Sequence, residues 1–145
     1  PFGPDPARMN ESLKMKQILW ALPVLLAASA CVGDETVRAY GGAEKTWMLE
    51  SLDGTAFAAE ATMLFPQTGQ IAGKAPCNSY TGAMDAPYPW FETGPLASTR
   101  MLCPDQAAED AFFQALGQMR QVEVLGDTLI LSTEDGREMV FKADG

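Results

Sequence analysis

Residues 122–142 read VEVLGDTLILSTEDGREMVFK and hold the clearest strand pattern in the 145-residue chain. Two apolar runs, 122–125 and 128–131, are separated by Gly126-Asp127, and this two-residue spacing predicts an antiparallel β-hairpin. After a further turn signal, apolar and polar side chains alternate along residues 138–142, as they do in a half-buried strand. We therefore predict that the carboxyl-terminal part of the chain is an antiparallel sheet.

Upstream of this hairpin, the strand pattern recurs in shorter pieces. Short apolar runs are separated by Gly, Pro or Asp-Gly turn signals about every eight to twelve residues, a spacing typical of antiparallel β architectures. The predicted strands are 47–52, 62–65, 70–73, 90–92 and 96–99.

One segment, residues 104–121, departs from the strand pattern. Its apolar residues recur at helical spacing from Ala108 to Met119, although Gly117 weakens the helix by about 1 kcal/mol relative to Ala. We therefore predict an α+β fold. It consists of a mostly antiparallel β-sheet or partial barrel of about seven or eight short strands, with one amphipathic helix packed on it.

The amino-terminal region has the composition of a targeting segment. Residues 18–26 form an apolar run that follows two lysines and is too short to span a membrane. We interpret residues 1–30 as a signal peptide with an upstream extension, and Cys31 as the site of cleavage and lipidation. The alternative is that Ala28-Ser29-Ala30 is the cleavage site of a soluble periplasmic protein.

These boundaries divide the chain into three parts and predict its location. Residues 31–45 are short, polar and rich in glycine, so we expect a lipid-anchored tether; residues 46–145 have the length of one small domain. The lipid on Cys31 would hold the protein in the cell envelope, facing the periplasm, and we expect the outer membrane to carry the anchor.

Lipidation of Cys31 would leave Cys77 and Cys103 as a pair. An exported protein is exposed to an oxidising compartment, in which such a pair forms a disulfide. The chain has no Cys-x-x-Cys motif, which disfavours a redox-active role for the pair. Two distant cysteines without any histidine do not form a usual zinc site, so we expect no metal and no cofactor.

The charge of the chain limits its partners. The formal net charge is −9, and nearly all acidic residues follow Cys31. This charge argues against nucleic acid, whose binding depends on cationic side chains that neutralise phosphates. It is compatible with a basic protein partner, or with solubility alone.

Several motifs resemble those of the META/HslJ-like domain family of bacterial envelope lipoproteins. The resemblance rests mainly on Cys-Asn-Ser-Tyr-Thr-Gly at residues 77–82, on Thr-Arg-Met-Leu-Cys-Pro at residues 99–104, and on Glu109 in the helix that follows. It implies a compact antiparallel β domain with one packed helix, and an association with heat shock and antibiotic tolerance. It implies no agreed biochemical activity and no catalytic residues.

A candidate recognition surface and its structural alternative both follow from the polar turn around residue 78. The candidate residues are Asn78, Tyr80, Tyr88, Trp90 and Arg100. In the structural alternative, Asn78 caps backbone groups, Gly82 supplies a positive φ, and the aromatic residues lie in the core. Arg100 then braces the turn by donating to carbonyls or to a carboxylate such as Glu109; its functional alternative is anion binding.

The sequence carries no pattern that predicts catalysis. It has no histidine, no Ser-centred nucleophile elbow and no phosphate-binding glycine loop. We therefore expect a non-enzymatic bacterial envelope lipoprotein, a stress-linked accessory or binding module for a protein or small-molecule ligand. The alternatives are an inhibitor of a basic envelope enzyme such as lysozyme, or a two-carboxylate hydrolase of cell-wall material.

Overall fold

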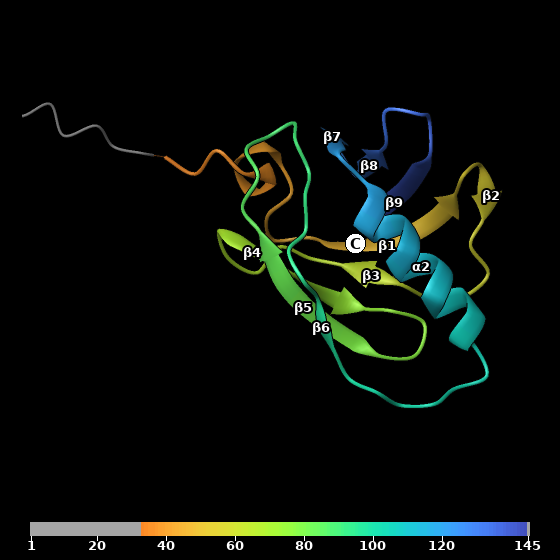
Figure 1. Cartoon of the computed structure of the whole chain (residues 1–145). Coiled ribbons are helices and arrows are strands. Elements are labelled where there is room, and N and C mark those ends of the chain that lie inside the picture. Colours follow the sequence, from red (N-terminus) through yellow and green to blue (C-terminus); the bar gives the residue numbers. More distant parts are fainter. Residues whose placement is uncertain (1–32, 145) are drawn as a thin grey trace, which may run out of the picture. The chain divides into compact units, whose positions relative to one another are not determined.

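The computed structural model describes residues 33–144 (Figure 1). The predicted signal peptide and the predicted lipidation site at Cys31 lie outside the described residues. Among residues 33–144, no helix is long and apolar enough to cross a membrane. The elements are η1 (Val37–Tyr40), β1 (Thr46–Leu52), β2 (Thr55–Ala56), β3 (Thr62–Met63), β4 (Gly69–Lys74), β5 (Ser79–Met84), β6 (Ala97–Ser98), α2 (Gln106–Gln118), β7 (Gln121–Leu125), β8 (Thr128–Ser132) and β9 (Glu138–Asp144).

The strands form two antiparallel sheets. The larger sheet has the order β2-β1-β9-β8-β7, with β3 also paired to β1, and the smaller sheet has the order β4-β5-β6. An isolated bridge between Leu64 and Ala72 links the two sheets, and another between Trp90 and Gln121 extends the larger sheet beyond β7. The two sheets do not close into a barrel. Among the described residues there are nine strands and one α-helix, which confirms the predicted α+β class.

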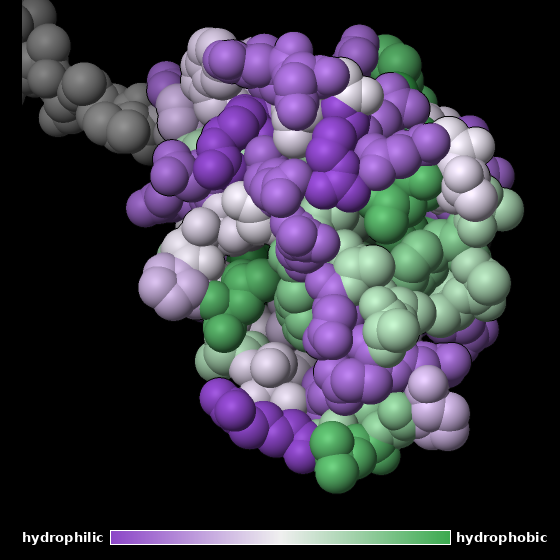
Figure 2. Space-filling view, turned by 45° about the vertical axis from the view of Figure 1, so that its right-hand side comes forward, coloured by the Kyte–Doolittle hydropathy of each residue, from purple (hydrophilic) through white to green (hydrophobic). Residues whose placement is uncertain are grey.

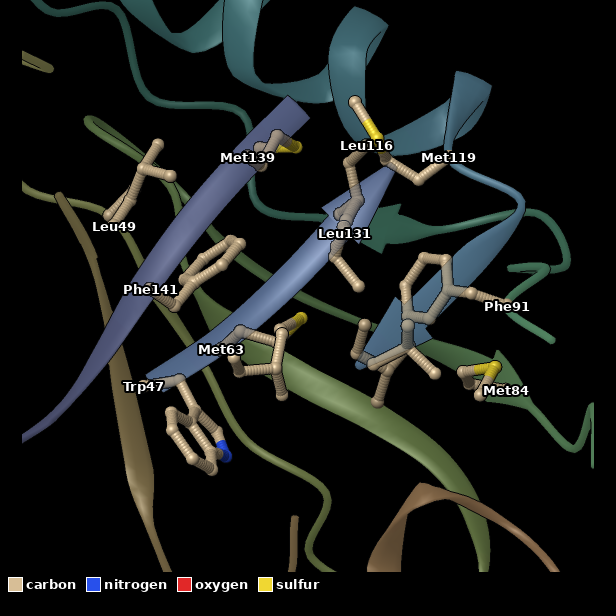
Figure 3. Close-up of a cluster of buried hydrophobic side chains, with 14 of the residues drawn as sticks. Trp47, Leu49, Met63, Met84, Phe91, Leu116, Met119, Leu131, Met139 and Phe141 are labelled. Atoms are coloured by element: carbon tan, nitrogen blue, oxygen red, sulfur yellow. The ribbon is translucent and has the colours of Figure 1, made fainter. Parts of the chain in front are cut away.

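The core lies between the sheets and the helix. Figure 3 shows Leu116 and Met119 pointing from the α2 region toward Leu131, Met139 and Phe141 of the larger sheet. These five side chains are buried completely, and burying a side chain of this size contributes about 2 kcal/mol. The predicted amphipathic helix is therefore confirmed, and its apolar stripe anchors it on the sheet.

Strand β5 occupies residues that the sequence analysis treated as a polar turn. Tyr80 and Met84 point into the core while Ser79, Thr81 and Ala83 are exposed, which is the alternation of a half-buried strand. Gly82 has no positive φ, and that prediction was wrong. It is glycine for a different reason, because a Cβ there would lie 2.6 Å from the Leu96 side chain.

The segment before β1 is packed against the domain, although the sequence analysis assigned residues 31–45 to a tether. Val37 is 1% exposed. The Tyr88 amide donates to the Glu35 carbonyl at 2.8 Å, and the indole N–H of Trp47 donates to the Gly42 carbonyl at 3.2 Å. From Asp34 onward, these residues belong to the folded unit. The sequence of this segment is polar and short, and it gives no periodic signal of this packing.

Candidate functional site

The motif residues around the disulfide form an internal hydrogen-bond network. Cys77 and Cys103 are bonded to each other, as predicted, with their Cα atoms 5.8 Å apart. Beside this disulfide, Glu109 of α2 is only 3% exposed. Its Oε1 accepts hydrogen bonds from the Asn78 amide at 2.7 Å and from the Cys77 amide at 3.2 Å, and its Oε2 accepts one from Asn78 Nδ2 at 2.7 Å.

The Asn78 side chain also holds the segment that precedes the helix. Its Oδ1 accepts hydrogen bonds from the Met101 amide at 2.7 Å and from the Thr99 hydroxyl at 2.9 Å. Its Nδ2 donates to the Met101 carbonyl at 3.2 Å as well as to Glu109. The structure thus gives Asn78 the backbone-capping role of the structural alternative, and leaves it only 5% exposed.

The environment of Glu109 keeps its carboxyl group ionised. Burial by itself raises the pKa of Glu109, but the hydrogen bonds from the Asn78 side chain, the Asn78 amide and the Cys77 amide outweigh burial. The pKa therefore lies below the ordinary value. A carboxylate of this kind is a poor proton donor or acceptor near neutral pH, so its position indicates a structural role.

Tyr80 also lies inside the domain. Its hydroxyl donates to the Thr62 carbonyl at 2.7 Å, and its ring packs edge-on against Phe113 with the centroids 5.6 Å apart. Gly73 leaves room for this contact, because a Cβ there would lie 2.8 Å from the Tyr80 hydroxyl. Burial raises the pKa of the Tyr80 phenol, which keeps the group a neutral donor.

The remaining candidate residues do not gather on one surface. Tyr88 stacks on Tyr40 with ring centroids 4.3 Å apart, and its hydroxyl accepts a hydrogen bond from the Val124 amide. Trp90 is 54% exposed. Arg100 is exposed and, among residues 33–144, takes part in no ion pair. The predicted brace from Arg100 to Glu109 is therefore wrong, because Asn78 and backbone amides already occupy that carboxylate.

Five large apolar side chains of the described residues are exposed: Tyr40, Trp90, Met101, Leu102 and Leu125. On the face shown in Figure 2, green hydrophobic residues gather mainly in the right-hand half, bordered by purple hydrophilic ones. Single exposed apolar residues are normal in soluble domains, so hydrophobicity alone does not identify a binding surface.

A groove between α2 and the segment that contains β6 is an open site that the sequence analysis missed. It is formed by two adjoining depressions that share Ser98 and Phe113. The first depression has a volume of about 590 Å³ and is lined by Glu92, Thr93, Gly94, Pro95, Leu96, Ser98, Phe113 and Gly117. We call the two depressions together the α2 groove. Gly117, an isolated helix glycine, was its one signal in the sequence.

The described residues offer no obvious metal centre. Within residues 33–144, no three His, Cys, Asp or Glu side chains lie close enough together to hold an ion. The chemistry that the α2 groove can offer comes instead from the Phe113 ring, from backbone polar groups of the β6 segment, and from the carboxylates of Glu92 and Asp110.

Two solved structures have a similar fold. A protein from Burkholderia xenovorans, solved by NMR, shares 22% identity at a TM-score of 0.60, over 85% of this chain and 99% of that chain. A crystal structure of a DUF4847 family protein from Bacteroides vulgatus shares 14% identity at a TM-score of 0.57, over 73% of this chain and 96% of that chain. At these identities, the likeness concerns the fold alone.

The family assignment rests on the sequence of the folded unit. No curated protein matches the chain. A sequence model described as META domain matches residues 42–145, which include the disulfide, the Asn78–Glu109 network and the α2 groove. The chain therefore belongs to the META domain family.

Proposed function

We propose that this protein is a non-enzymatic binding module of the bacterial envelope and that it binds its partner in the α2 groove. One observation carries the proposal. The polar groups of the motif residues Asn78 and Glu109 are occupied by internal hydrogen bonds, whereas the groove beside them is open and is lined in part by the Phe113 ring. Open sites with an apolar lining and a few polar groups are typical ligand sites.

The disulfide supports a location outside the cytoplasm. Stable disulfides persist in oxidising compartments such as the periplasm and are rare in the cytosol. Together with the lipoprotein pattern that ends at Cys31, the pair Cys77–Cys103 favours an envelope lipoprotein, anchored by lipid with the outer membrane as the expected site. The stress-linked accessory role is part of this proposal and comes from the family resemblance.

The anchor can be tested separately from the binding site. Cells that express the full chain are labelled with radioactive palmitate, beside cells that express Cys31→Ser. We expect label in the unsubstituted protein and none in the variant. Equal labelling of the two proteins would exclude Cys31 as the lipidation site.

The binding site can be tested by photo-crosslinking. A photoreactive amino acid is placed at position 95, an exposed residue that lines the groove, or at Glu134, in the exposed turn between β8 and β9. We expect a discrete crosslinked product in cells from position 95 and none from position 134. The same products from both positions would argue against the α2 groove as the binding site.

An inhibitor of a basic envelope enzyme such as lysozyme is the second candidate. It is favoured by the net charge of −9 and by the carboxylates of Glu92 and Asp110 in the groove, which are suited to a cationic surface. A turbidity assay of lysozyme action on cell-wall material, with the protein at micromolar concentration, tests this candidate. Unchanged lysis would remove it.

A further inference from the structure

The open edge of the smaller sheet faces the α2 groove. In the sheet order β4-β5-β6, strand β6 has a partner on one side only among residues 33–144. The Thr99 amide donates to the Ser79 carbonyl of β5 at 3.0 Å. Because successive backbone N–H groups of an extended strand point to opposite sides, the Ser98 N–H points away from β5. Ser98 lines both depressions of the groove, so this edge is accessible from it.

The groove is lined by both apolar and charged side chains, and among its exposed charged groups carboxylates outnumber guanidinium groups. Leu96 and Phe113 are half-buried and lie in the first depression. Two exposed carboxylates, Glu92 and Asp110, line the groove together with a single guanidinium, Arg100. The carboxylate of Glu109 is buried, and both of its oxygens accept internal hydrogen bonds. The groove therefore complements a segment that combines apolar and basic side chains.

The glycine at position 117 keeps the groove open, and this supports the groove as a binding site. A Cβ at this position would meet no heavy atom of the described residues within 4 Å, so packing inside the domain does not require glycine there. Its φ is not positive, so the backbone does not require glycine either. Glycine nevertheless costs the helix about 1 kcal/mol relative to alanine. A larger side chain at position 117 would project into the groove.

From these observations we infer that the α2 groove binds an extended segment of a partner polypeptide, which joins β6 as an additional strand. Apolar side chains of the segment lie over Phe113 and Leu96, and basic side chains lie beside Glu92 and Asp110. Strand addition of this kind takes its affinity from main-chain hydrogen bonds and its specificity from alternate side chains. The inference rests on the proposed function and names the chemistry of the ligand.

The test uses a fluorescein-labelled peptide of four Leu-Lys repeats and measures its binding to the full chain in detergent by fluorescence anisotropy. Two variants address the groove: Gly117→Leu fills it, and Ser98→Pro removes the amide that faces it while leaving the bonds to β5. Ala107→Leu is the matched control, since Ala107 is an exposed residue of α2 that does not line the groove.

We expect each groove variant to weaken binding at least about tenfold, and the control to leave it unchanged. A peptide with N-methyl groups on alternate residues, or with Glu in place of Lys, is expected to lose binding to the same extent. Equal affinity of all four proteins would overturn the inference, as would undiminished binding of the N-methylated peptide.

The outcome also separates this inference from the proposed function. If the Leu-Lys peptide does not bind at about 1 mM but position 95 still crosslinks to a partner in cells, strand addition is wrong and the binding module stands. If the peptide does not bind and position 95 gives no product, the inference and the proposed function both fail.

Discussion

The buried carboxylate of Glu109 links three segments of the chain, of which the turn at Cys77 and Asn78 is distant in sequence from the other two. Its own helix, the turn at Cys77 and Asn78, and, through Asn78, the backbone at Met101 are joined by hydrogen bonds of 2.7 to 3.2 Å. A buried polar network of this kind is stabilising only while every member is satisfied. Within the described residues, no buried side-chain nitrogen or oxygen lacks a partner.

Substitution of Glu109 by glutamine is expected to destabilise the domain. The amide group of glutamine would place a donor beside the donor Nδ2 of Asn78, whose Oδ1 is already used by Met101 and Thr99. An unsatisfied buried donor costs about 1–3 kcal/mol, so we expect a loss of about 2 kcal/mol in the free energy of unfolding, measured by urea denaturation at pH 7. Arg100→Ala is the control and should change stability by less than about 0.5 kcal/mol. A larger effect of the control than of Glu109→Gln would contradict the assigned roles.

The lowered pKa of Glu109 makes stability depend on pH in a defined direction. The unfolded carboxyl group has the ordinary pKa, 4.5, and takes up a proton at a higher pH than the folded group does. The contribution of Glu109 is therefore complete above that pH and is lost as the pH falls through the lower, folded value.

We expect the difference in unfolding free energy between the unsubstituted protein and Glu109→Gln to shrink as the pH is lowered from 7 to about 3. Asp34 and Asp53 also have lowered pKa values, because of hydrogen bonds from Thr36 and from Arg137 respectively. Both proteins should therefore lose some stability in acid, and only their difference reports on Glu109. If this difference in unfolding free energy grew toward acid pH, it would contradict the lowered pKa of Glu109.

At the scale of the elements, helix α2 contains a destabilising glycine, Gly117, that the fold does not require. Gly117 is exposed, adopts an ordinary helical φ, and has no neighbour that a methyl group would touch. Gly117→Ala should therefore stabilise the domain by about 1 kcal/mol, seen as a higher midpoint in thermal or urea denaturation. Gly73→Ala is the contrasting substitution, because its Cβ would lie 2.1 Å from the Thr62 carbonyl oxygen. Destabilisation by both would mean that position 117 has an unrecognised packing role.

The elements that the sequence predicted well are those with local signals. The hairpin of β7 and β8 was predicted from its Gly126-Asp127 turn, and α2 from its helical spacing of apolar residues. Strand β5 was missed because Asn78, Ser79 and Gly82 are typical turn residues. Their actual roles depend on partners distant in sequence, such as Glu109 and Leu96, and no local pattern reveals such partners.

At the scale of the whole molecule, the same limit applies to the candidate site. The disulfide followed from counting cysteines, but the α2 groove depends on how closely a helix approaches a sheet edge. Of the predicted recognition residues, Asn78 and Tyr80 are buried by residues far along the chain. Composition and motif spacing do not determine which aromatic side chains are covered. The segment before β1 was missed for the same reason, since its packing partners, Tyr88 and Phe65, follow it by many residues.

The disulfide is expected to contribute a large part of the free energy of unfolding of this small domain, but the fold is expected to form without it. Cys77 and Cys103 are 26 residues apart, and closing a loop of that size stabilises a protein by about 3.5 kcal/mol in the chain-entropy model. Neither cysteine belongs to the buried hydrophobic cluster, which includes Trp47, Phe112 and Phe141. The core should therefore assemble without the bond.

In a Cys31→Ser background, where the pair can be studied alone, we expect Cys77→Ser/Cys103→Ser to keep the far-ultraviolet circular dichroism spectrum of the parent. The melting temperature should fall by about 10 °C or more. Dithiothreitol should lower the melting temperature of the parent by the same amount and leave that of the double variant unchanged. An unfolded double variant would show that the core depends on the disulfide, whereas an unchanged melting temperature would show that the Asn78–Glu109 network alone holds the two segments together.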